Sequence, residues 1–325
     1  MSEPDDFVAR LRAERTDPER AGRLAADRRT RRRKTVWVSV GAVAVVAALG
    51  GWLYGSVGKR PADEPFAAPL LEEAQWPAPW PLTTRMPYRN SPARGWLTGE
   101  GGIDVPAAGA VPGVPAERVR DALWRTRELL TAANLDPGVL AGGRPERALA
   151  LLDPPSRARL AAALRAPGEG DADPARLVTR FDPAEVRVLT GGTRVLGALS
   201  YGPGRSSGEV LVRADVTFVY ALAAATPGGR PAPIPGVEAE EAARAIVRRR
   251  LVVAVRAVPG AGKTPGALVP VEQHHYLGNH DCGKADGFVH PYFAKQAPTP
   301  SAGAGADPYD RTGPLPAPCA PAARR

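Results

Sequence analysis

Two short stretches of the chain carry residue types that can do chemistry. AVPGAGKT, residues 257–264, fits a loose form of the phosphate-binding loop: a small residue, four residues of any type, then Gly-Lys-Thr. A second stretch of 17 residues holds all four histidines with a carboxylate and a thiol among them: His274, His275, His280, Asp281, Cys282 and His290. Such groups bind zinc or copper in proteins. What either stretch can do depends on the elements that position it.

The surroundings of AVPGAGKT argue against nucleotide binding. A working phosphate loop follows a strand and opens a helix, whose first N–H groups bind the phosphates. A strand pattern precedes this stretch, but the six residues after Thr264 include one glycine and two prolines, which cannot continue a helix. The first glycine of the motif is also replaced, by Ala257. We interpret the stretch as a long hairpin loop and expect no nucleotide or other cofactor.

The histidine cluster lacks the spacing of a metal site. Neighbouring residues on a strand point to opposite faces, so His274 and His275 cannot easily share one ion. His280 and His290 fall in a Gly-rich loop with no recurring ligand spacing. We therefore expect no metal and no catalytic residue here, and no enzyme. The alternative that stays open is a metal-binding or hydrolytic protein that uses residues 274–290.

The chain has only two cysteines, Cys282 and Cys319, with residues 283–318 between them. Outside the cytoplasm two thiols normally pair, and two cysteines allow only one intramolecular pairing. Closing this loop would stabilise the fold by about 4 kcal/mol on the chain-entropy model. We predict the disulfide, with free or intermolecular thiols, including a reactive Cys282–His280 pair, as the alternative.

A membrane anchor is predicted at residues 35–57, which run for 23 residues without a charge. A helix of that length spans roughly 34 Å at about 1.5 Å per residue, enough to cross a hydrocarbon core of about 30 Å. Aromatic residues suited to the membrane interface lie near its two ends: Trp37, Trp52 and Tyr54. Gly51 and Gly55 have the spacing of a helix-dimerisation face, so a homodimer through them is possible. A cleaved signal peptide would have a shorter apolar region followed by a cleavage site.

Basic residues just before this segment predict its orientation. Six of them stand together: Arg28, Arg29, Arg31, Arg32, Arg33 and Lys34. By the positive-inside rule they keep residues 1–34 in the cytoplasm and place the remainder outside. Of the net charge of +9, residues 1–34 carry +4, which leaves +5 for the other 291 residues. That balance argues against a nucleic-acid partner, and we predict a single-pass protein of the plasma membrane with an extracellular C-terminal domain.

The remaining segments differ in composition. Residues 1–34 are predicted to be a solvated basic tail, with docking of an acidic cytoplasmic partner as the alternative role. Residues 58–115 contain 11 prolines and are predicted to be a stalk, parts of which pack along the domain or present WPAPWP as a polyproline ligand. Residues 297–325 are rich in proline and are predicted to be disordered unless the disulfide holds them.

The folded domain is predicted at residues 116–296. Apolar residues at three- and four-residue spacing predict a long helix from residue 116 to about 134, followed by two short helices near residues 145–165, with Asp153 as an N-cap. The pattern then alternates with period 2 in residues 184–202, 208–223, 245–258 and 267–278, which predicts strands. Helices followed by consecutive antiparallel strands indicate an α+β fold: a curved sheet of four or more strands with the helices on one face.

This order of elements, with a single N-terminal anchor, resembles the nuclear-transport-factor-two-like (SnoaL-like or cystatin-like) domains. Such domains occur outside the membrane in the bitopic scaffold subunits of type IV secretion machines and in actinobacterial envelope proteins. The resemblance covers residues 115–295 and rests on element order without a signature motif. It implies a non-catalytic binding or scaffold role in the cell envelope, with an unidentified envelope protein or ligand as partner. A membrane-anchored sensor is the third class, but a 34-residue tail is too small for a signalling domain.

Overall fold

The computed structural model describes residue 73 and residues 81–225, 239–256, 266–294 and 307–318. The chain divides into two compact units, residues 1–67 and 68–325, and every described residue belongs to the second. No described helix is both long enough and apolar enough to cross a membrane. Residues 35–57 and their interfacial aromatic and basic neighbours lie outside the described residues.

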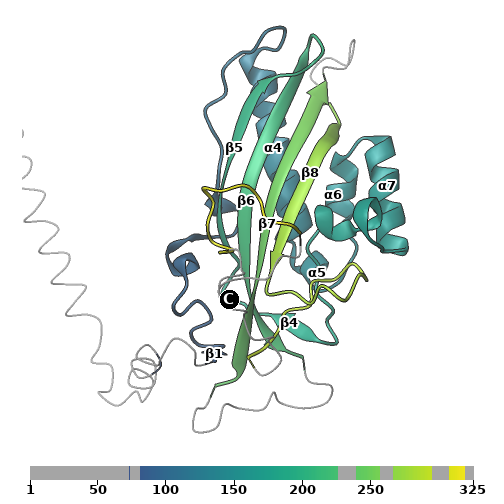
Figure 1. Cartoon of the computed structure of the whole chain (residues 1–325). Helices are drawn as coiled ribbons and strands as arrows, with labels where there is room; N and C mark the ends of the chain where they lie inside the picture. The colour runs from purple at the N-terminus through teal and green to yellow at the C-terminus, as the bar shows by residue number, and fades with distance from the viewer. Residues whose placement is uncertain (1–72, 74–80, 226–238, 257–265, 295–306, 319–325) are drawn as a thin grey trace, which may run out of the picture. The chain divides into compact units, whose positions relative to one another are not determined.

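The second unit is an α+β fold in which helices pack against a curled antiparallel sheet (Figure 1). Four long strands form the body of the sheet: β5 (Arg194–Pro203), β6 (Glu209–Ala224), β7 (Glu241–Arg256) and β8 (Leu268–Gly278). They pair antiparallel in chain order, as the period-2 alternation predicts. The predicted fold class is therefore confirmed at this level.

Within the described residues, four α-helices precede these strands. They are α4 (Ala116–Asn134), α5 (Pro137–Leu140), α6 (Glu146–Leu151) and α7 (Pro154–Arg165). Val119, Leu123 and Leu130 on α4 are fully buried and face the sheet, which is where their helical spacing puts them. Asp153 does occupy the N-cap position of α7, although its side chain makes no capping hydrogen bond there. We call the sheet surface that α4 covers the α4 face.

The stalk predicted for residues 58–115 differs from the structure over its second part. Residues 81–104 form three two-residue strands: β1 (Leu82–Thr83) pairs with β7, and β2 (Leu97–Thr98) and β3 (Ile103–Asp104) pair with β5. Single turns of 3₁₀ helix, η2 (Pro92–Gly95) and η3 (Gly99–Gly102), lie between them. Strands of two residues are too short for a periodic pattern, so composition alone suggested a stalk. Parts of the Pro-rich segment thus pack on the domain, one of the two alternatives considered for it.

Shorter elements complete the sheet and its edges. β4 (Val186–Val188) pairs with the end of β6. The 3₁₀ turn η4 (Gly170–Ala172) lies beside α7, and η5 (Pro174–Arg176) lies beside β8. The edge of β8 is interrupted by Pro270 and by a register shift between its partners Val252 and Val253. Proline and bulges at an edge strand limit further strand pairing.

The C-terminal residues 307–318 lie against the sheet surface opposite α4 (Figure 1). Tyr309 is buried there, and its ring contacts Trp96 edge to face with centroids 5.9 Å apart. This part of the predicted disordered tail is therefore packed on the fold. We call residues 307–318 the strap and the surface beneath them the strap face.

Candidate functional site

A groove of about 1210 Å³ opens between the strap and the strap face. Its floor takes side chains from all four long strands, in two rows that cross the sheet. One row is Ala198, Asp215, Arg250 and His274, and the next is Ser200, Arg213, Val252 and Glu272. Prolines of the strap form the opposite wall: Pro314, Pro316 and Pro318. The groove is larger than most small-molecule sites, which measure about 300–1,000 Å³.

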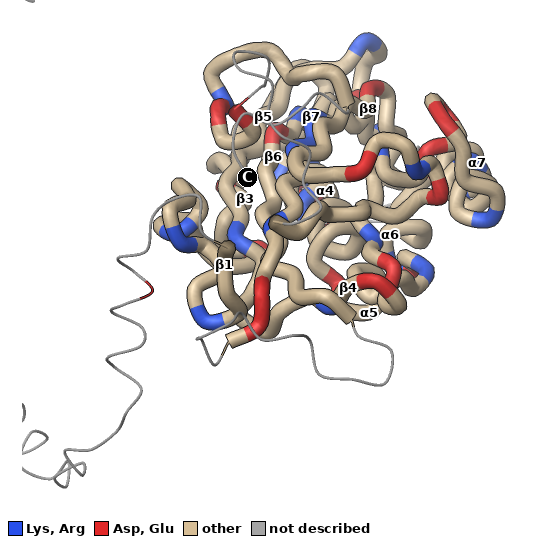
Figure 2. The backbone as a smooth tube through the Cα atoms, turned by 60° about the horizontal axis from the view of Figure 1, so that its bottom comes forward, with Lys and Arg blue, Asp and Glu red and all other residues tan. Residues whose placement is uncertain are grey.

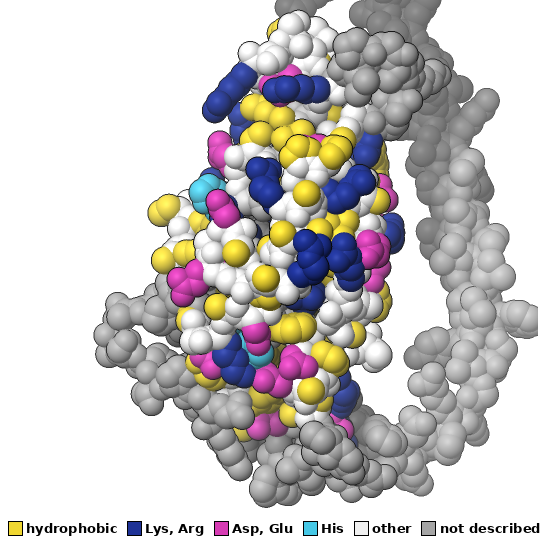
Figure 3. All heavy atoms as spheres, turned by 90° about the vertical axis from the view of Figure 1, so that its right-hand side faces the viewer, with side chains coloured by type: hydrophobic (Ala, Val, Ile, Leu, Met, Phe, Trp, Pro, Cys, Tyr) yellow, Lys and Arg dark blue, Asp and Glu magenta, His cyan; other side chains and the backbone are white. Residues whose placement is uncertain are grey.

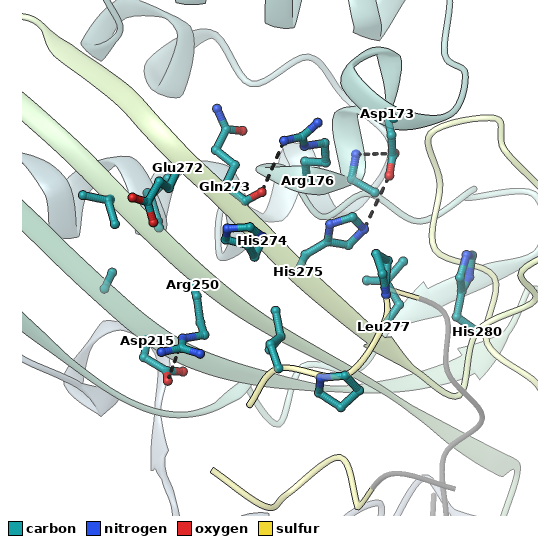
Figure 4. Close-up of a pocket in the computed structure, with 18 of the residues that line it drawn as sticks. Asp173, Arg176, Asp215, Arg250, Glu272, Gln273, His274, His275, Leu277 and His280 are labelled. Atoms are coloured by element: carbon teal, nitrogen blue, oxygen red, sulfur yellow. Dashed lines mark hydrogen bonds and ion pairs between the residues drawn. The ribbon is translucent and has the colours of Figure 1, made fainter. Parts of the chain in front are cut away.

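Charged side chains in the groove fall into two groups. Asp215 accepts two hydrogen bonds from Arg248, at 2.9 and 2.8 Å, and lies 3.7 Å from Arg250 (Figure 4). The carboxyl pKa of Asp215 is lowered: burial raises it, but the hydrogen bonds and charge of Arg248 outweigh that effect. Arg213 and Glu272, by contrast, make no hydrogen bond or ion pair with any described residue. They are the polar groups of the floor that a ligand can reach.

The strap is held by arginine contacts at one end and a backbone bond at the other. Arg248 of β7 donates to the carbonyl oxygens of Asp310 (3.0 Å) and Arg311 (3.2 Å). Arg311 in turn donates to the carbonyl oxygens of Asp215 (2.7 Å) and Leu196. At the other end the carbonyl oxygen of Pro318 accepts the outward-pointing N–H of Leu277 on β8, at 2.8 Å. The strap therefore crosses the sheet without a helix or strand of its own, held through its main chain at Asp310, Arg311 and Pro318 and through the side chain of Arg311.

The α4 face holds a second polar cluster, built around Arg249. Its guanidinium is about 1% exposed and donates to Asn134 Oδ1 (2.6 Å), the Ala175 carbonyl oxygen (2.6 Å) and Thr179 Oγ1 (2.8 Å). Burial lowers its pKa to about 10, against the opposing effect of Tyr220 and Asp173. Since these contacts anchor α4 and the η5 segment to β7, the cluster fixes the helix layer on the sheet.

His275 lies beside Arg249 and faces Asp173 at 3.4 Å (Figure 4). Burial, and then the positive charge of Arg249, lower the imidazole pKa to about 3. Burial raises the carboxyl pKa of Asp173. A histidine with so low a pKa stays neutral at physiological pH and is a poor general base, since efficient bases titrate near the working pH. This His–Asp pair therefore lacks the proton affinity that acid–base chemistry needs.

His290 is clamped between two carboxylates. Its Nδ1 lies 2.6 Å from Glu185 and its Nε2 lies 2.9 Å from Asp286, while Lys284 binds the other Glu185 oxygen at 2.8 Å. With both ring nitrogens engaged, neither can serve as a base or metal ligand. Hydrogen bonds from Lys284 and then His290 lower the pKa of Glu185. The cluster ties the loop after β8 to the segment before β4.

The predicted site residues are thus only partly brought together. His274 is exposed on the strap face and His275 is buried on the α4 face, which confirms that the two point in opposite directions. His280 and Cys282 both border the groove. Among the described residues, no three His, Cys, Asp or Glu side chains form a group that could hold a metal ion.

The predicted reactive pair of Cys282 and His280 does not have the geometry of a dyad. The Cys282 sulfur lies 3.7 Å from the backbone oxygen of His280 rather than from its ring. The ring nitrogen Nδ1 of His280 accepts the backbone N–H of His290 at 2.9 Å, and burial lowers its pKa to about 4. Cys319 lies outside the described residues, so the disulfide stays a prediction.

AVPGAGKT also lies outside the described residues, but its neighbours are described. β7 ends at Arg256, immediately before it, and β8 begins at Leu268 and pairs antiparallel with β7. The stretch therefore joins two adjacent antiparallel strands, and the element that follows it is a strand. This is the connection expected of a hairpin loop.

The distribution of surface groups is mixed. Figure 2 shows Lys and Arg interspersed with Asp and Glu over the described backbone. Figure 3, which faces the side where α6, α7 and β8 lie, shows hydrophobic side chains scattered between charged ones. The large hydrophobic side chains that are exposed lie singly on different elements: Leu97, Trp124, Leu196 and Val271. On the face that Figure 3 shows, the described residues form no broad apolar patch.

Comparison with protein-family models, with curated proteins and with solved structures finds no match for this chain. The resemblance to nuclear-transport-factor-two-like domains therefore stays an expectation. What the chain does has to be argued from its own geometry.

Several residues that build the site gave no signal in the sequence. Glu185 and His290 are 105 positions apart, and Asp215 and Arg311 are 96 apart, so no local motif joins them. One clue was present in RRR at residues 248–250, flanked on both sides by the apolar residues 245–247 and 251–255. Arginines in a buried strand need partners on both faces, and the strap and α4 supply them.

Proposed function

We propose that the chain is a single-pass membrane protein whose folded unit is a non-catalytic module that binds extended polypeptide segments in the cell envelope. One observation carries the binding role: the strap face already holds a polypeptide segment without helix or strand, through donors that bind its main chain, the Arg248 guanidinium and the Leu277 backbone N–H. Main-chain recognition by fixed donors is a recurring way to bind extended peptides. The groove beside the strap leaves Arg213, Glu272 and His274 available to a longer partner.

The state of the polar groups supports a non-catalytic role. Two histidines lie beside carboxylates. His275 is neutral because its imidazole pKa is lowered to about 3, and both ring nitrogens of His290 are engaged by carboxylates. A general base needs a free nitrogen and a pKa near neutrality. The membrane anchor at residues 35–57 and the basic residues before it support placement of the module outside the cytoplasm.

Site-specific photo-crosslinking tests the binding role. A photoreactive residue replaces Ser200 on the groove floor of the full chain, and a matched control replaces Arg120, which is exposed on α4. In membranes of cells that make the protein, we expect the Ser200 position to form an adduct with one polypeptide and the Arg120 position not to. Equal adduct yields at the two positions, or none at Ser200, would reject the groove as the binding surface.

A further inference from the structure

Three sets of contacts hold the strap, and they differ in whether they bind its main chain or its side chains. Arg248 binds the main chain of the strap, because it donates hydrogen bonds to the backbone oxygens of Asp310 and Arg311. Its orientation is fixed by a bidentate contact with Asp215, and it is almost fully buried. A guanidinium that binds carbonyl oxygens does not itself distinguish residue types, so this contact leaves the choice of side chain at these positions to other groups.

The other two sets of contacts bind side chains of the strap. Tyr309 is 8% exposed in a small apolar cluster with Val219, Ala221 and Ile246 of the strap face. Arg311 enters a set of acceptors: the carbonyl oxygens of Leu196 and Asp215, and Thr217 Oγ1 at 3.3 Å. The Asp215 carboxylate lies 3.5 Å from the same guanidinium. Two backbone carbonyl oxygens and a carboxylate among these groups only accept hydrogen bonds, so the set favours a cationic donor over an acidic side chain.

We propose that the strap stands in for a partner segment, and that the strap face selects polypeptides with an aromatic residue two positions before an arginine. This rests on the proposed binding function and specifies its partner. The internal segment shows the chemistry that the face accepts: an aromatic residue at the end of a turn, any residue, then arginine. An external segment of that type binds the same groups once the strap has left.

The strap is suited to displacement. It forms no helix or strand, and its contacts concentrate at residues 309–311 and at Pro318. Between these ends Thr312 and Pro314 are exposed. A segment that belongs to the same chain acts at an effective concentration of about a millimolar, so a free peptide competes poorly with it. A partner therefore binds well only when the strap's own contacts are weakened.

A peptide experiment tests the proposal on the full chain in detergent. The probe is a fluorescein-labelled peptide with the sequence of residues 307–318, DPYDRTGPLPAP. The chain variant Tyr309→Ala with Arg311→Gln frees the strap face, and anisotropy measures binding. We expect this variant to bind the peptide at least tenfold more tightly than the unchanged chain does. Near-ultraviolet circular dichroism checks that it stays folded, and the single variant Arg311→Gln serves if it does not.

Peptide variants supply the matched controls. Replacing the arginine of the probe by glutamine removes charge-assisted hydrogen bonds, so we expect about tenfold weaker binding. Replacing its threonine by alanine changes a residue whose hydrogen bonds go to Asp310 within the strap, so we expect less than a twofold change. No binding to a folded variant, or equal affinities for the two altered peptides, would overturn the proposal. A groove adduct at Ser200 without peptide selectivity would leave the binding function standing and reject this partner.

Discussion

Arg248 and Arg249 are neighbours on one strand, yet each is buried on a different face. Arg248 pairs with Asp215 on the strap face, whereas Arg249 has only neutral acceptors within hydrogen-bonding distance on the α4 face. Removing a buried charged group that satisfies several acceptors is strongly destabilising, because those acceptors lose their partners without regaining water. The two residues therefore support different halves of the fold.

Arg249→Ala should lower the free energy of unfolding by about 3 kcal/mol or more, because Asn134, Thr179 and the Ala175 carbonyl lose their donor. Urea denaturation followed by circular dichroism measures the change. The adjacent Arg250→Ala is the control, since that side chain is half exposed and lies 3.7 Å from Asp215. Arg250→Ala should lower the free energy of unfolding by less than about 1 kcal/mol, as the loss of an exposed ion pair does. Equal losses would contradict the role given to Arg249.

Stability should fall between pH 7 and pH 5 because of His275. Its pKa is about 3 in the folded chain and near 6.5 when unfolded, so below pH 6.5 the unfolded state binds a proton that the folded state does not. Stability therefore decreases with falling pH from 6.5 downward. His275→Gln should reduce this slope, with Asp173, Arg249 and Arg176 still in place around position 275. Parallel urea titrations of both proteins at pH 7 and pH 5 provide the measurement, and an unchanged slope would argue against this origin.

At the scale of elements, close packing between β5 and β6 depends on Gly197. A Cβ built there would lie 2.6 Å from the Val216 Cα and 2.7 Å from the Asp215 oxygen, both main-chain atoms of β6. Main chain cannot move aside as a flexible side chain can. The missing side chain thus lets the two strands stay paired at the point where β3 joins β5.

Gly197→Ala should lower stability by about 1–3 kcal/mol through overpacking. Gly202→Ala on the same strand is the matched control, because its new methyl group would meet only the end of Arg213, at 3.5 Å. That change should stay within about 0.5 kcal/mol. Thermal unfolding of the two variants side by side decides the matter, and a similar midpoint for both would refute the close-approach argument.

The strap also bears on the predicted disulfide. Pro318, which precedes Cys319, bonds to Leu277, and both Pro318 and Cys282 border the groove. We predict a Cys282–Cys319 bond that stabilises the fold by about 4 kcal/mol. Mass spectrometry of a non-reduced digest should find the linked peptide pair, and reductant should speed proteolysis of the strap. Complete alkylation of both thiols without reductant would exclude the bond.

Regular periodicity predicted the long elements, and its absence explains the elements that were missed. α4 and the strands β5 to β8 have enough residues for a helical or alternating pattern to show. Strands β1 to β3 have two residues each, and the strap sequence YDRTGPLPAP has no period at all. Within the candidate site, the alternation of side chains along a strand correctly predicted that His274 and His275 lie on opposite faces of the sheet. Contacts such as Asp215 with Arg311 depend on tertiary structure, which no local pattern encodes.

On the scale of the whole molecule, the prediction concerns orientation in the membrane. Residues 35–57 are uncharged and follow a basic cluster, which predicts a cytoplasmic N-terminus. A cysteine placed at Ser2 should resist an impermeant thiol reagent in intact cells, while one placed at Ser301 should react. Peptide mapping separates these sites from the native cysteines. Reaction at Ser2 with protection at Ser301 would reverse the proposed orientation.

The contact between Trp96 and Tyr309 has a consequence for synthesis. The two rings lie 213 positions apart in the sequence, and together with η2 they close the same apolar cluster. At about 5–20 residues per second, a ribosome needs roughly 10–40 s to make the intervening chain. Throughout that interval Trp96 lacks the Tyr309 ring, and once β7 has been made Arg248 lacks two of its acceptors until residues 310 and 311 follow. A nascent chain is therefore most open to chaperones or to premature association on this side until residues 309–311 have been added.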